Sequence, residues 1–396
     1  MRQIHFPVWL GAAATTGNPS FVILFSLEAL TRAVLVTVLP LQALALLGDA
    51  QAVSVFYFGV SFAGLAGTLA VPWLVRRLRR RWVVTLATIS IVAAAPLFAS
   101  GTLTGLAAGL AVHLVGAASL SICLNLYVLD HVPRKVLTRF EPLRMLFTGA
   151  AWMLGPVLGV ALGSRLAPWV PYGASAGFVL ALLAYFWFLR MTENPVLAAA
   201  TAPPPNPVLF VRRYFSQPRL SLAWLLSLGR AGWWGMFFIY TPIYAVTAGL
   251  GEEIGALIVS AGSAAMFTVT FWGWVGRRFG LRRLMVGGFI ATGLITFAVG
   301  AAAGTPWLGA ALIVIACFGA CAVDGAGNVP FLRAVRTRER AEMTTVYASY
   351  RDTARLSMPG IFALVLQVFA LPAVFVTGGL IMLGMAHFAR YIPRRL

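Results

Sequence analysis

Charged residues are scarce in this sequence. Asp, Glu, Lys and Arg make up only 10% of its 396 residues, whereas 60% of the residues are hydrophobic. A water-soluble domain of this length needs a much larger polar surface around its core. Apolar runs of about 18 or more residues recur along the chain, and each is long enough to cross a bilayer as a helix. The composition therefore excludes an ordinary soluble protein and predicts a polytopic membrane protein.

Cysteine and catalytic motifs are also scarce. The three cysteines, Cys123, Cys317 and Cys321, all fall within apolar runs, so we expect neither a disulfide framework nor a metal site. The sequence has no nucleotide-binding loop of the G-x-x-x-x-G-K type, which argues against direct drive by ATP. It also has no nucleophile–base pair and no cluster of metal ligands. We therefore expect no enzyme activity and no cofactor.

Acidic residues are fewer than basic ones, 11 against 30, which gives a formal net charge of +19. We expect twelve spans, near residues 20–46, 51–75, 82–100, 103–129, 145–163, 168–190, 219–247, 251–275, 284–303, 306–330, 343–369 and 371–390. Basic residues then gather in alternate connections, at 76–81, 134–139, 212–219, 277–283 and 333–340. Arg165 is the one basic residue in the opposite set of loops. The positive-inside rule therefore predicts a multi-pass protein of the bacterial inner membrane with both termini in the cytoplasm, and not a nucleic-acid partner.

The longest polar interruption divides the chain into two halves. Residues 191–218 are rich in proline, which disfavours helix, so we expect a cytoplasmic linker between six-helix bundles at 1–190 and 219–396. Three pairs of landmarks repeat at nearly one offset: Trp73 with Trp274, Pro40 with Pro242, and Pro156 with Pro359. The sequence thus predicts an all-α membrane protein of two homologous, pseudo-symmetric halves.

The repeated loop GWVGRRFGLRR, residues 273–283, resembles the signature that follows the second span in the major facilitator superfamily. Gly273, Arg278, Gly280 and Arg282 match family positions, and the first-half copy keeps Arg77. Both copies have an arginine where the family has an acid that helps latch the cytoplasmic side. The resemblance covers nearly the whole chain and implies the family's twelve-helix fold and alternating access. It makes Arg77, Arg278 and Gly280 candidate gating residues. The alternative is a basic loop that only sets topology.

The fifth span contains AWMLGPVLG, which resembles the motif of the family's proton-coupled exporters. Its Gly155, Pro156 and Gly159 would let helices approach closely and bend, so they are candidate conformational residues. Generic small-residue packing is the alternative. The resemblance implies a monomeric secondary transporter in the lipid bilayer that moves a small molecule against protons, by efflux. The alternatives are proton symport of an organic anion held by Arg32 or Arg230, a lipid flippase, or a non-transporting assembly protein.

Charges inside the spans are costly unless they are paired or face water. Glu28 and Arg32 lie four residues apart and share one helix face. Through the internal repeat, Glu28 corresponds to Arg230, and the resemblance implies that spans one and seven face each other across a central cavity. We therefore expect a breakable Glu28–Arg230 pair, with a static Glu28–Arg32 pair as the alternative. Glu28 is a candidate proton-coupling residue.

Span seven carries a cation and aromatic rings at helical spacing. Arg230, Trp233, Phe237, Tyr240 and Tyr244 share one face, which suits a solute with a flat body and a polar group. We predict that the first four bind substrate, with aromatic packing as the alternative reading.

Two further spans contribute polar candidates. Asp324 is a second proton-coupling candidate, or else the partner of an arginine in span eleven, and Asn328 on its face is a substrate-binding candidate. In span eleven, Asp352 is a third coupling candidate, and Arg351 and Arg355 are gating candidates. Asn125 is expected to contact substrate from span four. His113 of the same span is expected to be a packing residue.

Overall fold

The computed structural model describes residues 19–132, 134–189, 207–302, 304–336 and 339–393. This part of the chain is helical and contains no strand. Eleven of its helical segments are long and apolar enough to cross a membrane. The predicted eleventh span, 343–369, is the exception, because it is divided into two shorter helices, α17 (Arg340–Ala348) and α18 (Tyr350–Val365). The all-helical architecture predicted from the sequence is confirmed.

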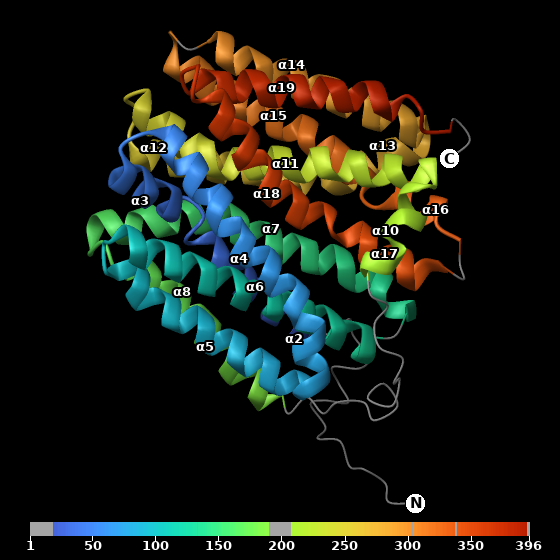
Figure 1. The fold of residues 1–396 in the computed structure, drawn as a ribbon, viewed down its shortest axis with the longest axis horizontal. Coiled ribbons are helices and arrows are strands. Elements are labelled where there is room, and N and C mark those ends of the chain that lie inside the picture. Colours follow the sequence, from blue (N-terminus) through green and yellow to red (C-terminus); the bar gives the residue numbers. More distant parts are fainter. Residues whose placement is uncertain (1–18, 133, 190–206, 303, 337–338, 394–396) are drawn as a thin grey trace, which may run out of the picture.

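The first half of the chain forms one bundle, in the lower part of Figure 1. Its helices are α2 (Pro19–Ala33), α3 (Val38–Leu47), α4 (Ala50–Arg77), α5 (Arg80–Ala99), α6 (Leu103–His131), α7 (Arg134–Arg165) and α8 (Val170–Phe188). The predicted first span is divided into α2 and α3. Pro40 has no backbone N–H to donate to the carbonyl group of Val36, so the helix restarts at this point.

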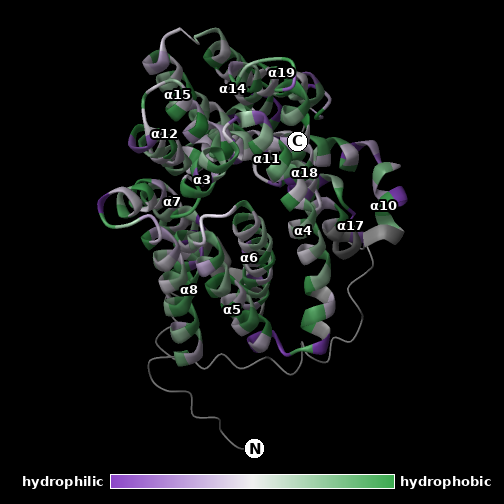
Figure 2. Ribbon diagram, turned by 60° about the vertical axis from the view of Figure 1, so that its left-hand side comes forward, coloured by the Kyte–Doolittle hydropathy of each residue, from purple (hydrophilic) through white to green (hydrophobic). Residues whose placement is uncertain are grey.

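The second half forms the upper bundle of Figure 1. Its helices are α11 (Pro218–Thr247), α12 (Glu252–Ala264), η1 (Ala265–Thr268), α13 (Val269–Phe279), α14 (Leu281–Ala301), α15 (Pro306–Ala326), α16 (Val329–Ala334), α17, α18 and α19 (Pro372–Ala389). Figure 2 shows hydrophobic residues along most of the helices and hydrophilic ones at ends such as the α4–α5 connection.

The expected linker is partly helical. Residues 190–206 lie outside the described residues, but α10 (Pro207–Phe215) follows them and packs on α17. Pro207 occupies the first turn, where a helix needs no N–H donor, so this proline is compatible with helix. The buried Tyr214 donates a hydrogen bond to the carbonyl oxygen of Leu220 at 3.0 Å, and Arg213 pairs with Glu339. The expectation that the whole of 191–218 is non-helical is therefore wrong.

The two halves pack together at one end of the bundle. This end carries the short loops before α4, α8 and α12, and it is sealed by Leu41, Val160 and Ala256. Ser54 and Tyr240 share a hydrogen bond of 2.7 Å across it. Toward the opposite end, which carries the basic connections, the buried clusters lie within single halves. The halves are thus closed at the short-loop end.

Helices α4 and α18 keep the halves in contact beyond that seal. Ser61 Oγ donates to the carbonyl oxygen of Arg355 at 2.9 Å, and further along α4 Thr68 Oγ1 donates to Asp352 Oδ1 at 3.4 Å. Both contacts join the N-terminal half to the C-terminal half. The polar end of α18 is therefore held against α4, beside the charged residues of the central site.

Candidate central site between the two halves

Each half contributes a carboxylate–arginine pair from the interior of its bundle. In the first half, Arg32 Nε lies 3.1 Å from Glu28 Oε1, and their side chains are 29% and 4% exposed. In the second half, Arg230 Nε lies 3.4 Å from Asp324 Oδ1, and their side chains are 13% and 24% exposed. The expected Glu28–Arg230 pair is absent from this structure, because each acid meets a nearer arginine within its own bundle. The alternative Glu28–Arg32 pairing is the one observed.

The Arg230–Asp324 pair belongs to a wider network on α11, α15 and α18. Trp234 Nε1 donates to Asp324 Oδ2 at 2.8 Å. Arg230 Nη2 and Arg351 Nε both donate to Tyr350 Oη, at 3.3 and 3.1 Å. Asp324 therefore pairs with an arginine of span seven and not of span eleven, and span eleven contributes Tyr350 and Arg351 instead.

Asn328 lies just beyond the end of α15 and not within it. Gly327 has a positive φ of 53° and ends the helix there. Asn328 Oδ1 accepts a hydrogen bond of 3.0 Å from Tyr347, whose hydroxyl group also lies 2.7 Å from Ser227 Oγ. Asn328 thus joins α15 to α17, and its predicted role in substrate binding stays a prediction.

Aromatic rings connect the two ion pairs across the halves. The guanidinium carbon of Arg32 lies 5.5 Å from the centre of the Trp152 ring on α7. Trp152 in turn lies 5.0 Å from Phe238 on α11, and Phe238 stacks on Trp234 at 5.8 Å. Because Trp234 donates a hydrogen bond to Asp324, a continuous set of contacts runs from the Glu28–Arg32 pair to the Arg230–Asp324 pair. We call Trp152, Phe238 and Trp234 the aromatic bridge.

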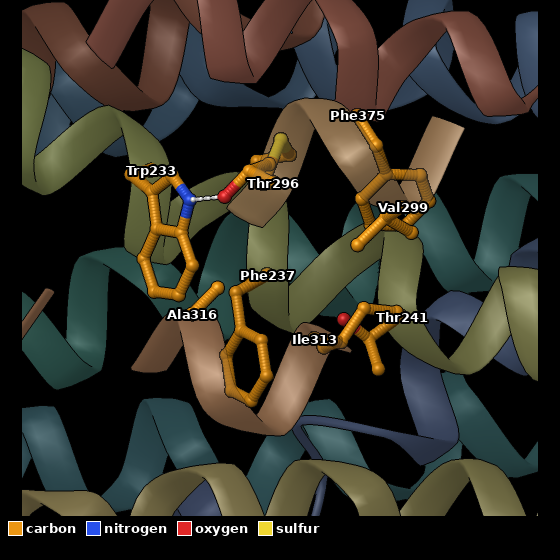
Figure 3. A pocket seen from close by; sticks show the side chains of 9 residues that line it. Trp233, Phe237, Thr241, Thr296, Val299, Ile313, Ala316 and Phe375 are labelled. Atoms are coloured by element: carbon orange, nitrogen blue, oxygen red, sulfur yellow. Dashed lines mark hydrogen bonds between the residues drawn. The ribbon is translucent and has the colours of Figure 1, made fainter. Parts of the chain in front are cut away.

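The predicted aromatic substrate face of span seven is wrong. Trp233, Phe237 and Tyr240 are 4%, 1% and 0% exposed. Trp233 and Phe237 point into the core of the C-terminal half, whereas Tyr240 packs on Phe362 and reaches Ser54 where the halves close. Trp233 Nε1 donates to Thr296 Oγ1 at 2.9 Å, and Phe237 lines the same small apolar pocket (Figure 3). Aromatic packing, the alternative reading, is what the structure has. The ring face turned toward the N-terminal half belongs to Trp234 and Phe238, one position further along α11.

Arg355 lies on α18, and its carbonyl oxygen accepts the hydrogen bond from Ser61 of α4. Its side chain is exposed and makes no ion pair or hydrogen bond with the residues that the structure describes. Within the described part of the chain, Asp352 accepts the long hydrogen bond from Thr68.

The polar candidates of span four lie apart from the aromatic bridge. His113 is 5% exposed, and its ring lies 6.0 Å from the Phe98 ring. This burial agrees with its expected packing role. Asn125 is exposed and donates to the carbonyl oxygen of Ser121 at 2.8 Å. Its contact with a solute stays a prediction.

The two copies of the basic loop have matching local structure. Arg77 lies over the Trp73 ring at 4.7 Å, and Arg278 lies over the Trp274 ring at 5.5 Å. Gly280 has a φ of 96° at the turn between α13 and α14, a conformation that favours glycine. The two copies of the repeat therefore share the same Trp–Arg side-chain contact. The gating role of these residues stays a prediction.

The glycines of the fifth span lie where α7 packs on α2. A Cβ atom at Gly155 would lie 2.6 Å from the carbonyl carbon of Ala33, and one at Gly159 would overlap the carbonyl oxygen of Val34. Pro156 is buried beside them. Close helix approach at this motif is therefore observed, and it holds the helix that carries Glu28 and Arg32.

Sequence reasoning missed four residues of this site: Trp152, Trp234, Phe238 and Tyr350. Trp234 follows Arg230 by four residues, so helical spacing would have been enough to place it on the same face as the cation. Trp152 lies inside the motif AWMLGPVLG, which drew attention to its glycines. Tyr350 directly precedes the charged run of span eleven. No sequence signal connects Phe238 to Trp152, because their contact depends on how the halves meet.

Solved structures of transporters share this fold. A variant of the nucleoside transporter NupG matches with a TM-score of 0.77 and 14% identity, covering 94% of this chain and 99% of that one. A peptide transporter, POT, in complex with sulfate matches with a TM-score of 0.73 and 14% identity, covering 97% of each chain. A POT family transporter in complex with 5-aminolevulinic acid matches with a TM-score of 0.70 and 12% identity, covering 93% of this chain and 95% of that one.

No curated protein matches the chain at a significant level. The model of the Major Facilitator Superfamily matches residues 21–359, which is most of the sequence. Together with the two-bundle fold, this match shows that the chain is a multi-pass membrane transporter, and not an enzyme, of the Major Facilitator Superfamily.

Proposed function

We propose that this transporter couples solute movement to protons through Glu28 and Asp324. The observation that carries the proposal is the Glu28 carboxylate, which is 4% exposed and has Arg32 as its charged partner. A buried carboxylate next to a single arginine changes the local balance of charge when it is protonated. Protonation of Glu28 would leave Arg32 without a counter-ion, and protonation of Asp324 would do the same for Arg230.

The sign of this coupling determines the type of transport. A solute that needs a free arginine binds better once the carboxylate is protonated, so the solute and the proton cross together, as symport. A cationic solute competes with the proton for the carboxylate, which gives antiport. Because coupling between two ligands is reciprocal, either relationship must appear in binding as well as in flux.

The charges of the site favour symport of an anion. Four arginines, Arg32, Arg230, Arg351 and Arg355, stand on these helices against three carboxylates, Glu28, Asp324 and Asp352. We therefore propose proton symport of an organic anion, the alternative that the sequence left open. The named cargoes of the structural neighbours are a nucleoside, a peptide and 5-aminolevulinic acid, which supports small polar solutes in general.

Efflux by antiport is the second candidate. It was predicted from the exporter-like motif of span five, and the close packing of Gly155 and Gly159 on α2 supports that motif. For antiport the solute would be a cation that replaces the proton on Glu28 or Asp324. The transport direction relative to an imposed pH gradient separates the two candidates.

The proposed orientation follows from the basic connections. With these connections in the cytoplasm of a bacterial inner membrane, the closed short-loop end faces outward. The conformation described here would then be the one that exchanges solute with the cytoplasm, and both termini would be cytoplasmic.

Flux measurements in proteoliposomes test the proposal. Purified protein is reconstituted and screened with labelled organic acids, nucleosides, peptides and organic cations under an imposed pH gradient. We expect an inward proton gradient to drive accumulation of an acid, and Glu28→Gln and Asp324→Asn to abolish that drive while solute exchange at equal pH continues. Arg165→Gln, at the exposed last residue of α7, is the control. Gradient-driven accumulation that persists in both carboxylate variants would contradict proton coupling.

A further inference from the structure

Two guanidinium groups converge on the phenolic oxygen of Tyr350. Arg230 Nη2 of α11 and Arg351 Nε of α18 donate hydrogen bonds to Tyr350 Oη, at 3.3 and 3.1 Å. The guanidinium carbons of these two arginines lie 6.0 and 5.6 Å from the centre of the Tyr350 ring. Like charges held this close repel one another more strongly when they are shielded from bulk water. The pair is therefore stabilised by negative charge placed beside it.

Asp324 supplies the negative charge in this structure. Its Oδ1 atom lies 3.4 Å from Arg230 Nε, and its Oδ2 atom accepts a hydrogen bond of 2.8 Å from Trp234 Nε1. Arg351 makes no ion pair with any residue in the described ranges. One carboxylate thus contacts one of two arginines. Protonation of Asp324 would leave both guanidinium groups without a carboxylate in contact.

Hydrogen-bond donors of this group are free and partly open to solvent. Arg351 is exposed, and the side chains of Arg230 and Asp324 are 13% and 24% exposed. In the part of the chain that the structure describes, Arg351 donates through Nε alone, so both of its terminal nitrogens are available. A guanidinium group offers five donors in a flat fork that fits a carboxylate. An acid group entering beside Tyr350 would therefore find unused donors.

The aromatic bridge adjoins these donors. Trp234, which donates to Asp324, stacks on Phe238 at 5.8 Å. Phe238 lies 5.0 Å from Trp152 of the other half, and none of the three rings is fully buried. Binding sites for small molecules commonly combine apolar and aromatic surface with a few polar groups that fix orientation. Here the two kinds of surface meet at Trp234.

We propose that Arg230 and Arg351 bind the carboxylate of an organic acid once Asp324 is protonated, and that the apolar body of this acid lies along the aromatic bridge. The assignment rests on the proposed transport function and adds to it the position of the anion and the character of the solute. The solute carboxylate takes over the contact that Asp324 makes with Arg230. Without the proton, two carboxylates would compete for the same guanidinium group. Solute and proton therefore favour each other's binding, as symport requires.

Other charged and titratable groups surround Asp324 on neighbouring helices. They are Arg219, Tyr240 and Tyr244 of α11, Glu252 and Glu253 of α12, Arg277 and Arg278 of α13, Arg282 and Arg283 of α14, Cys317 and Cys321 of α15, Tyr347 of α17, and Asp352 and Arg355 of α18. Within the described residues, the ion pair of Asp324 is with Arg230. The pH dependence of carboxylate binding is therefore assigned to Asp324, and substitution of this residue tests it.

Binding to the purified full chain tests the subsite. The probes are benzoate and indole-3-acetate, each compared with its neutral amide, and acetate, which has almost no apolar body. At mildly acidic pH we expect the two aromatic carboxylates to raise the thermal unfolding temperature in a saturable way, and the amides and acetate to leave it unchanged. Arg351→Gln should weaken carboxylate binding by about tenfold or more, as expected for loss of charge-assisted hydrogen bonds. Arg165→Gln should bind like the unmodified protein.

Asp324→Asn gives the opposite expectation. It keeps an acceptor for Trp234 and removes the charge that competes with the solute. At neutral pH this variant should bind benzoate about tenfold or more tightly than the unmodified protein, because its binding-competent state is fully populated. Its affinity should no longer rise on acidification. Because the two variants change affinity in opposite directions, a general loss of folded protein cannot produce both results.

Three results would each overturn the proposal: equal binding of carboxylates and amides, unchanged carboxylate affinity in Arg351→Gln, or weaker binding by Asp324→Asn. Proton-driven flux can persist in all three cases, since it does not require this position for the anion. Conversely, carboxylate binding with no proton-driven flux would leave the subsite in place and contradict the transport proposal. The two failures are therefore distinguishable.

Discussion

The guanidinium carbon of Arg32 lies 5.5 Å from the centre of the Trp152 ring, so the charged pair of α2 is in contact with the first ring of the aromatic bridge. Trp152 then contacts Phe238 of the other half at 5.0 Å. Any change in the position of one half relative to the other must alter this second contact. The relationship therefore connects the charge state of Glu28 to the packing between the halves.

Removal of the Trp152 ring should weaken solute binding and not only stability. Cation–π contacts contribute about 0.5 to 2 kcal/mol, so Trp152→Leu should lower solute affinity by about two- to thirtyfold. Trp152→Phe keeps a ring and should lose less. Trp307→Leu, at a tryptophan that is 66% exposed, is the matched control. Titration of the solute against each purified variant measures the effect, and equal affinity of Trp152→Leu and the control would exclude Trp152 from the site.

The Arg230–Asp324 pair should show strong non-additivity. Both side chains keep some solvent exposure, so each single substitution, Arg230→Gln or Asp324→Asn, should cost about 1–3 kcal/mol, between the values for exposed and buried pairs. The double variant should recover part of that loss, because neither charge is then left alone. A double-mutant cycle on thermal unfolding measures the coupling. Additive losses would show that the two residues act independently.

Loss of the hydrogen bond between Ser54 and Tyr240 should favour opening of the short-loop end. This bond of 2.7 Å crosses the halves, and a typical hydrogen bond contributes about 0.5–1.5 kcal/mol. Tyr240→Phe should therefore shift the equilibrium toward the opened state by about two- to twelvefold. Tyr172→Phe is the matched control, because its hydroxyl group donates to Gln42 within one half.

Spin labels can measure that shift. Leu166→Cys and Trp307→Cys place labels on exposed positions of different halves near the short-loop end. The native cysteines Cys123, Cys317 and Cys321 are buried, which limits background labelling. We expect a larger population at long distance in Tyr240→Phe. An unchanged distance distribution would mean that this hydrogen bond does not hold the closed end.

A methyl group at Gly155 should be poorly tolerated. Its Cβ atom would meet the backbone of Ala33 on α2, where no flexible side chain can move aside. We expect Gly155→Ala to destabilise the protein by about 1–3 kcal/mol, the usual cost of overpacking. Gly177→Ala is the control, since no atom lies within 4 Å of its added Cβ. Thermal unfolding of the two variants gives the comparison, and equal stability would contradict close packing of α7 on α2.

Much of the fold could be predicted from local sequence patterns. The length of the apolar runs predicted the membrane-spanning helices, and the distribution of arginines predicted their orientation in the membrane. Both signals depend on whether a single segment is surrounded by lipid or by water. The landmarks Trp73 and Trp274 predicted two related halves, and the two Trp–Arg stacks agree with that repeat. The division of span eleven at Ser349 was not predicted. The charged residues that begin α18 look in the sequence like the continuation of one long helix.

Pair identities within the site were less predictable. The repeat aligned Glu28 with Arg230, but correspondence in a repeat fixes the equivalent position and not the partner. Asp324 comes from α15, in the same bundle as Arg230, and it reaches Arg230 first. The face of α11 was also misassigned by one position: Trp233 and Phe237 fill the core of their own half, whereas Trp234 and Phe238 meet the other half.

By itself, the sequence determined that this chain spans a membrane as two related helical bundles with a few charges inside, because hydrophobic length and repetition are local properties. The tertiary structure alone decided which charges meet. It paired Glu28 with Arg32 and Arg230 with Asp324, and it connected the two pairs through Trp152, Phe238 and Trp234. Those contacts depend on how helices distant in the chain pack, and a difference of one residue in rotation about a helix axis turns a side chain by about 100°.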